Sequence, residues 1–234
     1  MTEELNLQSN TSKTERRNSG TVKDKKHRVT EQIRELILSG TLAPGCRISQ
    51  ESLAEHCGTS RIPVRDALAR LENDGLVILK PNSGAWVAKL DLNECIESYK
   101  IREQLEPLAL AEAIPKMSDE QIAQLQGMVE DMKQVEDTEE FLKLDRLFHL
   151  SSYQASGMNQ LNPMIERFWN TTQHYRRAFT KLIGQDGTWI IHAEHTLMVE
   201  AIRRRDAEGA ARILKEHIRR TRVNLEKHSE IFTH

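Results

Sequence analysis

The sequence contains few of the residues that mark several common classes of protein. Its 234 residues include three cysteines and no CxxC spacing, which excludes a disulfide framework and a zinc ribbon. Aromatic residues make up 5% and prolines number six, which argues against a β-sandwich or barrel. No run of about 18 apolar residues is present, and residues 1–20 lack the apolar segment of a secretory signal. We therefore expect a helical, cytoplasmic protein that makes no use of a membrane.

The net charge of −2 hides an uneven distribution of charge along the chain. Residues 21–90 carry eleven Lys/Arg against eight Asp/Glu, whereas residues 91–234 carry nineteen against twenty-four. A small basic segment joined to a larger acidic one indicates that the first segment meets a polyanion.

The first part of the chain predicts short helices followed by a hairpin. Residues 1–20 are polar and predict a disordered tail. Apolar residues with helical spacing predict a helix over residues 24–39, and further helices are expected over 50–57, with Ser49 as N-cap, and 62–73. Strands are expected over 76–80 and 85–88, on either side of the turn residues Pro81–Gly84.

This order of elements is that of a winged helix-turn-helix, although a small helical domain of another purpose has the same local patterns. Arg61 and Arg65 are four residues apart and share the N-terminal face of the third helix. That end of a recognition helix reads bases in the major groove, where arginine binds guanine or phosphate. The pattern favours DNA binding by residues 21–90.

Residues 24–89 also resemble the N-terminal domain of GntR-type bacterial transcription factors. The resemblance is carried by the string LAPGCRISQESLAEHCGTSRIPVRDALARLENDGLVILKPNSGAWV. It implies that Arg61 and Arg65, flanked by Ser60 and Ile62, contact an operator. It also implies that the wing tip, from Asn82 to Gly84, enters the minor groove. Many relatives carry a DNA-contacting arginine where this chain has Glu51, so the chain departs from the family pattern at that contact, and whether Glu51 alters DNA recognition stays open.

The rest of the chain, residues 91–234, predicts helices alone. We expect helices near 92–115, 118–135, 138–155, 159–182, 187–205 and 207–230, with Ser118 and Thr138 as N-caps. The predicted fold is therefore all-α with a small β wing, in which an N-terminal winged helix-turn-helix precedes a C-terminal antiparallel helical bundle. Neither a glycine-rich phosphate loop nor the strands of a Rossmann fold are present.

Four residues of this second part form a candidate metal site. Asp145 and His149 are four residues apart on one helical face, and His195 and His217 lie in two later helices. Such residues meet inside helical bundles that bind metal, and a set of three nitrogens and one oxygen suits Zn, Ni, Mn or Fe. From these four residues alone, ordinary core or surface histidines are the better explanation.

Residues 92–230 resemble the FCD effector domain found in the FadR branch of GntR regulators. The strings DRLFHLSSYQASGMNQL and HAEHTLMVEAIRRRDAEGAARILKEHI carry the resemblance. It implies that Asp145, His149, His195 and His217 hold a divalent ion, with His192 as the alternative to His195.

The same resemblance implies that Arg102 binds the carboxylate of an effector at the metal. The alternative for Arg102 is an internal ion pair with a neighbouring glutamate. Trp169, Asn170, His174 and Tyr175 lie on one predicted helix and are expected to line the effector cavity or to belong to the core. Arg176, Arg177 and Arg203–Arg205 are expected on solvent-facing surfaces.

Together these features predict a homodimeric, ligand-responsive regulator, expected to be a repressor, that binds a palindromic double-stranded operator and senses a small carboxylate. The alternative is a metal-dependent enzyme of the non-haem iron or hydrolase type with a DNA-binding appendage. Against an enzyme, the sequence has no HExxH-type general base beside the metal residues. A metal that only braces the bundle, and an activator in place of a repressor, stay open.

Overall fold

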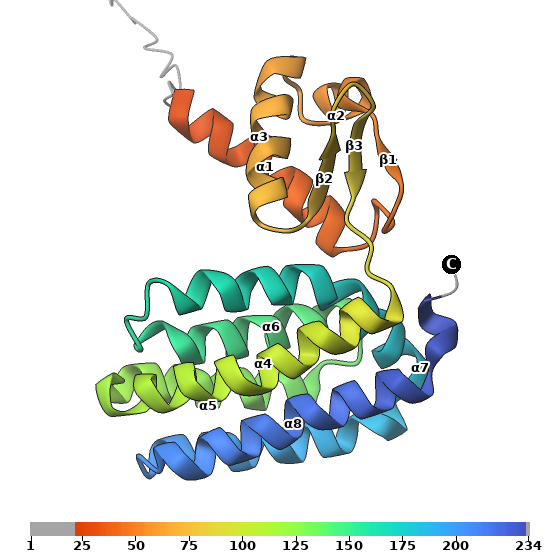
Figure 1. The fold of residues 1–234 in the computed structure, drawn as a ribbon. Helices are drawn as coiled ribbons and strands as arrows, with labels where there is room; N and C mark the ends of the chain where they lie inside the picture. Colours follow the sequence, from red (N-terminus) through yellow and green to blue (C-terminus); the bar gives the residue numbers. More distant parts are fainter. Residues whose placement is uncertain (1–21, 233–234) are drawn as a thin grey trace, which may run out of the picture.

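The computed structural model describes residues 22–232, so the tail predicted over residues 1–20 lies outside the described residues. Two separate hydrophobic cores are present, one formed between Val29 and Val87 and the other between Cys95 and Leu225. We call the elements around the first core the winged module and those around the second the helical module. Figure 1 shows the two modules side by side, joined by the yellow segment that leads from β3 into α4.

The winged module has the predicted order of elements and one additional strand. It consists of α1 (Val22–Leu38), β1 (Arg47–Ile48), α2 (Gln50–His56), α3 (Arg61–Asn73), β2 (Val77–Lys80) and β3 (Gly84–Val87). The strands form an antiparallel sheet in the order β1-β3-β2. Ser49 caps α2, as predicted, by accepting a hydrogen bond from the backbone N–H of Ser52. The apolar stripe of α3 packs inward, which leaves the opposite face of α3 on the surface.

The helical module is built from long helices packed side by side. Its elements are α4 (Leu92–Ala113), η1 (Ile114–Lys116), α5 (Asp119–Gln134), α6 (Thr138–Gln154), α7 (Leu161–Arg203), α8 (Ala207–Lys227) and η2 (Ser229–Phe232). The helices predicted over 159–182 and 187–205 together make up α7, and Gly184, with non-helical backbone angles, forms a kink between them. Ser118 is the N-cap of α5, as predicted, and forms a capping box with Gln121.

The predicted N-cap of α6 is wrong by one residue. Asp137, not Thr138, lies at the N-cap, and its carboxylate accepts a hydrogen bond from the backbone N–H of Glu140. Thr138 is the first helical residue. Aspartate is as good an N-cap as threonine or better, so the adjacent Asp-Thr pair offered two candidates that spacing alone does not separate.

The two modules contact each other through side chains of α7. Asn170 donates a hydrogen bond of 2.8 Å to the carbonyl of Asp74, and Arg177 donates to the carbonyl of Leu38 at the end of α1. Gly75 lies so close to α7 that a Cβ there would stand 2.9 Å from the side chain of Thr171. Among the described residues, no helix has both the length and the apolar character needed to cross a bilayer.

Candidate metal centre and nucleic-acid interface

The four predicted metal ligands come together inside the helical module. Asp145 and His149 extend from α6, His195 from α7 and His217 from α8. One ligand atom from each lies within 4.8 Å of all the others, and all four residues are buried. The Oδ1 atom of Asp145 is 3.8 Å from Nε2 of His149 and 3.4 Å from Nε2 of His195.

Neighbouring side chains orient these residues. Nδ1 of His217 lies 2.7 Å from a carboxylate oxygen of Glu194, and Nδ1 of His149 lies 3.3 Å from the hydroxyl of Tyr153. Histidines that bind metal usually use their second nitrogen in this way, which fixes the tautomer and the ring orientation. Nε2 of His217 and of His149 is thereby left to face the cluster.

The charges of the cluster are those of a metal site. Burial lowers the pKa of His195 to about 3 and that of His217 to about 4, and it lowers the pKa of His149 well below the usual value. Burial opposes ionisation of Asp145, but the charge of Arg176 and the smaller effects of the three histidines together outweigh it, and the pKa of Asp145 is lowered. At neutral pH the cluster therefore presents one carboxylate and three neutral imidazoles, the protonation states that bind divalent metals.

One buried atom tests whether these residues fit a metal ion. Oδ1 of Asp145 has no hydrogen-bond partner among the described residues, whereas Oδ2 is paired with Arg176. A buried carboxylate oxygen without a partner is costly. Because Oδ1 faces two imidazole nitrogens, a divalent cation between them satisfies all three atoms, and the donor set fits the metal that the sequence predicts.

His192, the alternative to His195, lies outside the group of four. Its ring makes an edge contact with Phe141, with 5.5 Å between ring centroids, and it is only partly buried. The structure thus brings His195, not His192, to the cluster.

Two of the five predicted effector residues lie beside the cluster. The ring of Trp169 is 5.2 Å from that of His149, and the guanidinium of Arg102 lies 4.4 Å from the centroid of Trp169. Arg102 also forms the internal ion pair that the sequence left open, with 2.5 Å between its Nε and a carboxylate oxygen of Glu106. The other oxygen of Glu106 accepts hydrogen bonds from Tyr153 and Trp169. One network therefore joins Arg102 to the histidine cluster.

The other three predicted effector residues lie elsewhere. Asn170 is bound to the winged module and to Arg146. The hydroxyl of Tyr175 is 2.6 Å from both the N–H and the carbonyl of Leu90, so it holds the segment between the modules. His174 lines a separate groove with Tyr175 and Phe232. Helical spacing placed these residues on one helix but did not indicate which side of α7 faces the winged module.

Arg176 and Arg177 are buried and do not lie on the solvent-facing surface that the sequence predicts. Arg176 pairs with Asp145 and lies 4.6 Å from the centroid of Trp169. Arg177 pairs with Glu139, 2.7 Å away. Arg205 is also engaged, with the carbonyls of Ile114 and Met117. Sequence reasoning missed these roles, and that of Glu194, because the partners are distant along the chain.

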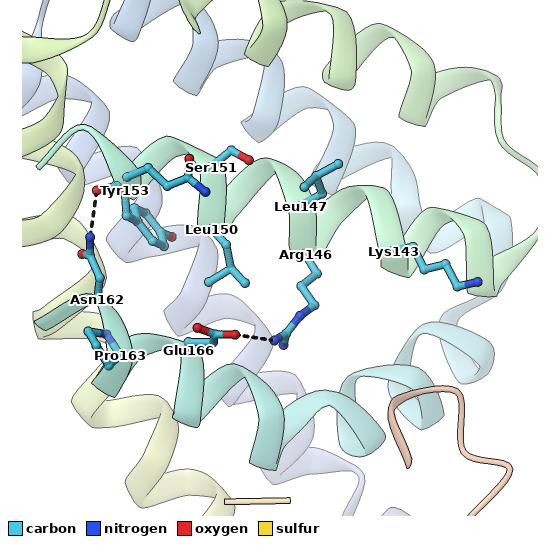
Figure 2. Close-up of a pocket in the computed structure, with 10 residues that line it drawn as sticks. Lys143, Arg146, Leu147, Leu150, Ser151, Tyr153, Asn162, Pro163 and Glu166 are labelled. Carbon is cyan, nitrogen blue, oxygen red and sulfur yellow. Dashed lines mark hydrogen bonds and ion pairs between the residues drawn. The ribbon is translucent and has the colours of Figure 1, made fainter. Parts of the chain in front are cut away.

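A cavity of about 570 Å³ opens between α6 and α7 near the cluster. Figure 2 shows that Arg146 reaches from α6 toward Glu166, at 3.9 Å, and that Tyr153 lies at the other end of the cavity. Tyr153 is therefore shared by this cavity and by the network around His149.

The predicted DNA-contacting residues are all exposed on the winged module. Arg61, Arg65, Ser60 and Ile62 are exposed at the start of α3. The side chain of Arg61 is 63% exposed and lies 2.7 Å from the carboxylate of Glu51, the residue that departs from the GntR pattern. Asn82 and Gly84 are exposed in the hairpin and have positive φ angles of 57° and 118°, which suits asparagine and glycine.

Comparison with known proteins identifies both modules. Residues 25–87 match "Bacterial regulatory proteins, gntR family", and residues 97–220 match the FCD domain. An uncharacterized HTH-type transcriptional regulator of Bacillus subtilis, YdhC, is 30% identical over 80% of this chain and 83% of its own length. The Escherichia coli HTH-type transcriptional regulator McbR is 29% identical over 80% of this chain and 86% of its own.

A further relative and a solved structure agree with these matches. The Escherichia coli HTH-type transcriptional repressor RspR is 24% identical over 80% of this chain and 82% of its own length. The solved structure of Escherichia coli McbR/YncC superposes with a TM-score of 0.78 and 27% identity, covering 87% of this chain and 97% of that one. These proteins and domains are transcription regulators, which supports the regulator over the enzyme alternative. The chain belongs to the GntR family of bacterial regulators, in the FadR-like branch with an FCD effector domain, and is a DNA-binding transcriptional regulator.

Proposed function

We propose that this regulator is a cytoplasmic repressor that senses a small carboxylate at a divalent metal ion in its helical module. The observation that carries the proposal is the convergence of four buried ligand atoms within 4.8 Å. In this proposal residues 21–90 bind DNA and residues 91–234 bind metal and effector.

Asp145, His149, His195 and His217 would hold the metal, and Zn, Ni, Mn and Fe all suit this donor set. When bound, such an ion offers a Lewis-acidic position to an oxygen of the effector. Support comes from the unpartnered Oδ1 of Asp145 and from the carboxylate of Glu194 behind His217. If the cluster served only to fill the core, its buried carboxylate oxygen without a partner would lower the stability of the fold with nothing to offset the loss.

Arg102 and Trp169 are the residues proposed to recognise the effector. A guanidinium binds a carboxylate through two parallel hydrogen bonds. In the described arrangement Glu106 accepts from Nε of Arg102, and Thr172 lies 3.0 Å from Nη1. To bind an effector carboxylate, Arg102 would therefore have to release Glu106 or bind both carboxylates at once. Glu106 also accepts a hydrogen bond from Tyr153, whose hydroxyl lies beside His149. This network gives the effector a way to act on the cluster.

The proposed DNA contacts are Ser60, Arg61, Ile62 and Arg65 on α3, with Asn82 and Gly84 at the wing tip. All six are exposed. We propose that a homodimer presents two such surfaces to a palindromic operator, because linking two weak half-site contacts raises affinity through effective concentration. Repression is proposed because the relative RspR is described as a repressor.

The test is operator binding in the presence of a panel of small carboxylates, with and without a chelator. The operator fragment is first selected from random DNA by the wild-type protein. We expect one class of carboxylate to change DNA affinity roughly 5- to 150-fold, the range of common allosteric couplings, and the chelator to abolish the change. Arg102→Ala should bind DNA and metal but lose the response. A carboxylate response that persists after chelation would contradict the proposal, as would an unchanged response in Arg102→Ala.

A further inference from the structure

A second cavity, of about 250 Å³, lies between the two modules and involves none of the four metal-ligand candidates. The winged module contributes α1 to this cavity, and the helical module contributes α6 and α7. Its cationic side chains are Arg34 from α1, Lys143 and Arg146 from α6, and Arg177 from α7. We call this space the intermodule cavity.

Three of these guanidinium groups have a buried nitrogen without a partner. The Nη1 atoms of Arg34, Arg146 and Arg177 are buried and have no hydrogen-bond partner within residues 22–232. The side chain of Arg177 is only 8% exposed. A buried donor without an acceptor destabilises the fold, and more so when it is charged. All three arginines line the intermodule cavity, so an acceptor that carries negative charge there would be within reach of their guanidinium groups.

The acidic residues around the intermodule cavity are already engaged. Glu139 accepts from Nε of Arg177 and also pairs with Lys181, 3.3 Å away. Glu31 pairs with Arg34 at 3.3 Å. Glu35 lies 3.9 Å from Lys143, and both side chains are largely exposed. None of these carboxylates accepts from the three Nη1 atoms.

Arg146 has the weakest pairing of the three arginines. Its Nη2 donates to the amide oxygen of Asn170 at 2.7 Å, and its ion pair with Glu166 is long, at 3.9 Å. Figure 2 shows this pair on the side of Arg146 that faces the larger cavity. Arg146 also lines the intermodule cavity, together with Arg34 and Arg177.

We propose that the intermodule cavity binds a small, multiply charged oxyanion, such as phosphate or a short dicarboxylate. Planar guanidinium groups are well suited to such oxygens because each presents parallel N–H donors. The volume is below the roughly 300–1,000 Å³ of sites for drug-sized ligands, which favours a compact ion. Gln173 is buried at the same cavity with an unpartnered amide oxygen, and turning the amide over would offer a further donor.

Binding at this cavity links the two modules. Arg34 belongs to the DNA-binding part of the chain and Arg146 and Arg177 to the effector part, so the anion contacts both. A ligand that bridges two bodies favours the arrangement in which both can reach it. The oxyanion therefore stabilises the described arrangement of the modules, independently of the metal and its effector.

The test is titration calorimetry of the full-length protein with inorganic phosphate and, separately, with malonate, repeated after chelation to exclude anions bound to metal. We expect one of these anions to bind at one site per chain. Arg146→Gln and Arg34→Gln should each weaken binding about tenfold, the loss of one charge-assisted hydrogen bond. Arg203→Gln, on the exposed end of α7, is the matched control and should bind as the wild type does.

Several results would overturn the proposal. These are the absence of binding by either anion at millimolar concentration, unchanged binding in Arg146→Gln, or binding lost in Arg61→Ala, which would place the anion on the DNA-binding surface. Arg34 and Arg146 lie in different modules. If either Arg34→Gln or Arg146→Gln fails to fold, anion binding by the other variant still tests whether the intermodule cavity is the site. Thermal unfolding of each variant identifies such a failure.

Discussion

At the scale of single residues, the candidate metal ligands depend on side chains that are not ligands themselves. Arg176 engages one oxygen of Asp145 and leaves the other facing the histidines. Glu194 holds His217, and Tyr153 holds His149. The sequence predicted the four ligands through the FCD resemblance. It could not predict Arg176 or Glu194, because nothing local distinguishes a buried ion pair from a charge on a solvated helix face.

On the proposed DNA-binding surface, Arg61 is paired with a neighbouring carboxylate, that of Glu51. Glu51 is exposed and holds Arg61 in an ion pair of 2.7 Å. An exposed pair of this kind contributes little to stability, but its carboxylate would lie close to the phosphates of bound DNA.

Arg61→Ala should lose about 1–3 kcal/mol of operator binding if the side chain reads a base. Glu51→Gln should bind more tightly at low salt, because it removes a negative charge from the surface and releases Arg61. Fluorescence anisotropy with the selected operator measures both effects. Arg70→Ala, an exposed change toward the end of α3, serves as control. Operator binding by Arg61→Ala at wild-type strength would contradict the assignment of α3 as recognition helix.

At the scale of elements, hydrophobic patterns that extend over a whole helix or hairpin strand predicted that element well. Features that depend on one or two residues were predicted less well. The amphipathic helices and both hairpin strands lie where periodicity placed them. β1 has two residues and exists because Arg47 and Ile48 pair with Trp86 and Ala85, a partnership that no local signal shows. The break predicted between residues 182 and 187 is present as a kink at Gly184, whose backbone angles are non-helical.

The start of α6 offers an element-scale test, because α6 carries both Asp145 and His149. Asp137→Ala removes the side-chain acceptor of the N-cap and should lower the free energy of unfolding by about 1 kcal/mol. Thr138→Ala changes the neighbouring residue, which does not cap the helix, and should have a smaller effect. Urea denaturation measures both variants. A larger loss in Thr138→Ala than in Asp137→Ala would show that the cap is misassigned.

At the scale of the whole molecule, side chains of α7 join the two modules. Asn170 and Arg177 bind backbone carbonyls of the winged module, and Tyr175 binds the segment at Leu90 that leads into α4. These contacts lie on the part of α7 that precedes the kink at Gly184, and His195 lies on the part that follows it. Because sequence periodicity does not tell which face of a long helix meets another module, Asn170 and Tyr175 were predicted to line the effector cavity or belong to the core, and Arg177 was predicted to face solvent.

The buried histidines predict how stability depends on pH. Their pKa values in the folded state are lowered, to about 3 for His195 and about 4 for His217, whereas an unfolded histidine titrates near pH 6.5. Below that pH the unfolded chain binds more protons than the folded chain. Stability is therefore full above about pH 6.5 and falls as the pH drops toward 4, by up to about 1.4 kcal/mol per pH unit for each proton.

Urea midpoints of chelator-treated protein at pH 8 and pH 5 measure this effect. The midpoint should be clearly lower at pH 5. Equal midpoints at the two pH values would mean that the histidines are not buried in the neutral form.

The central claim, that Asp145, His149, His195 and His217 bind a divalent metal, is tested most directly by elemental analysis of untagged protein after metal reconstitution and dialysis. The wild type and His192→Ala should each retain about one ion per chain, as expected for a single four-ligand site, whereas His195→Ala should lose it. A wild-type protein without metal, or a His195→Ala variant that retains as much metal as the wild type, would contradict the account.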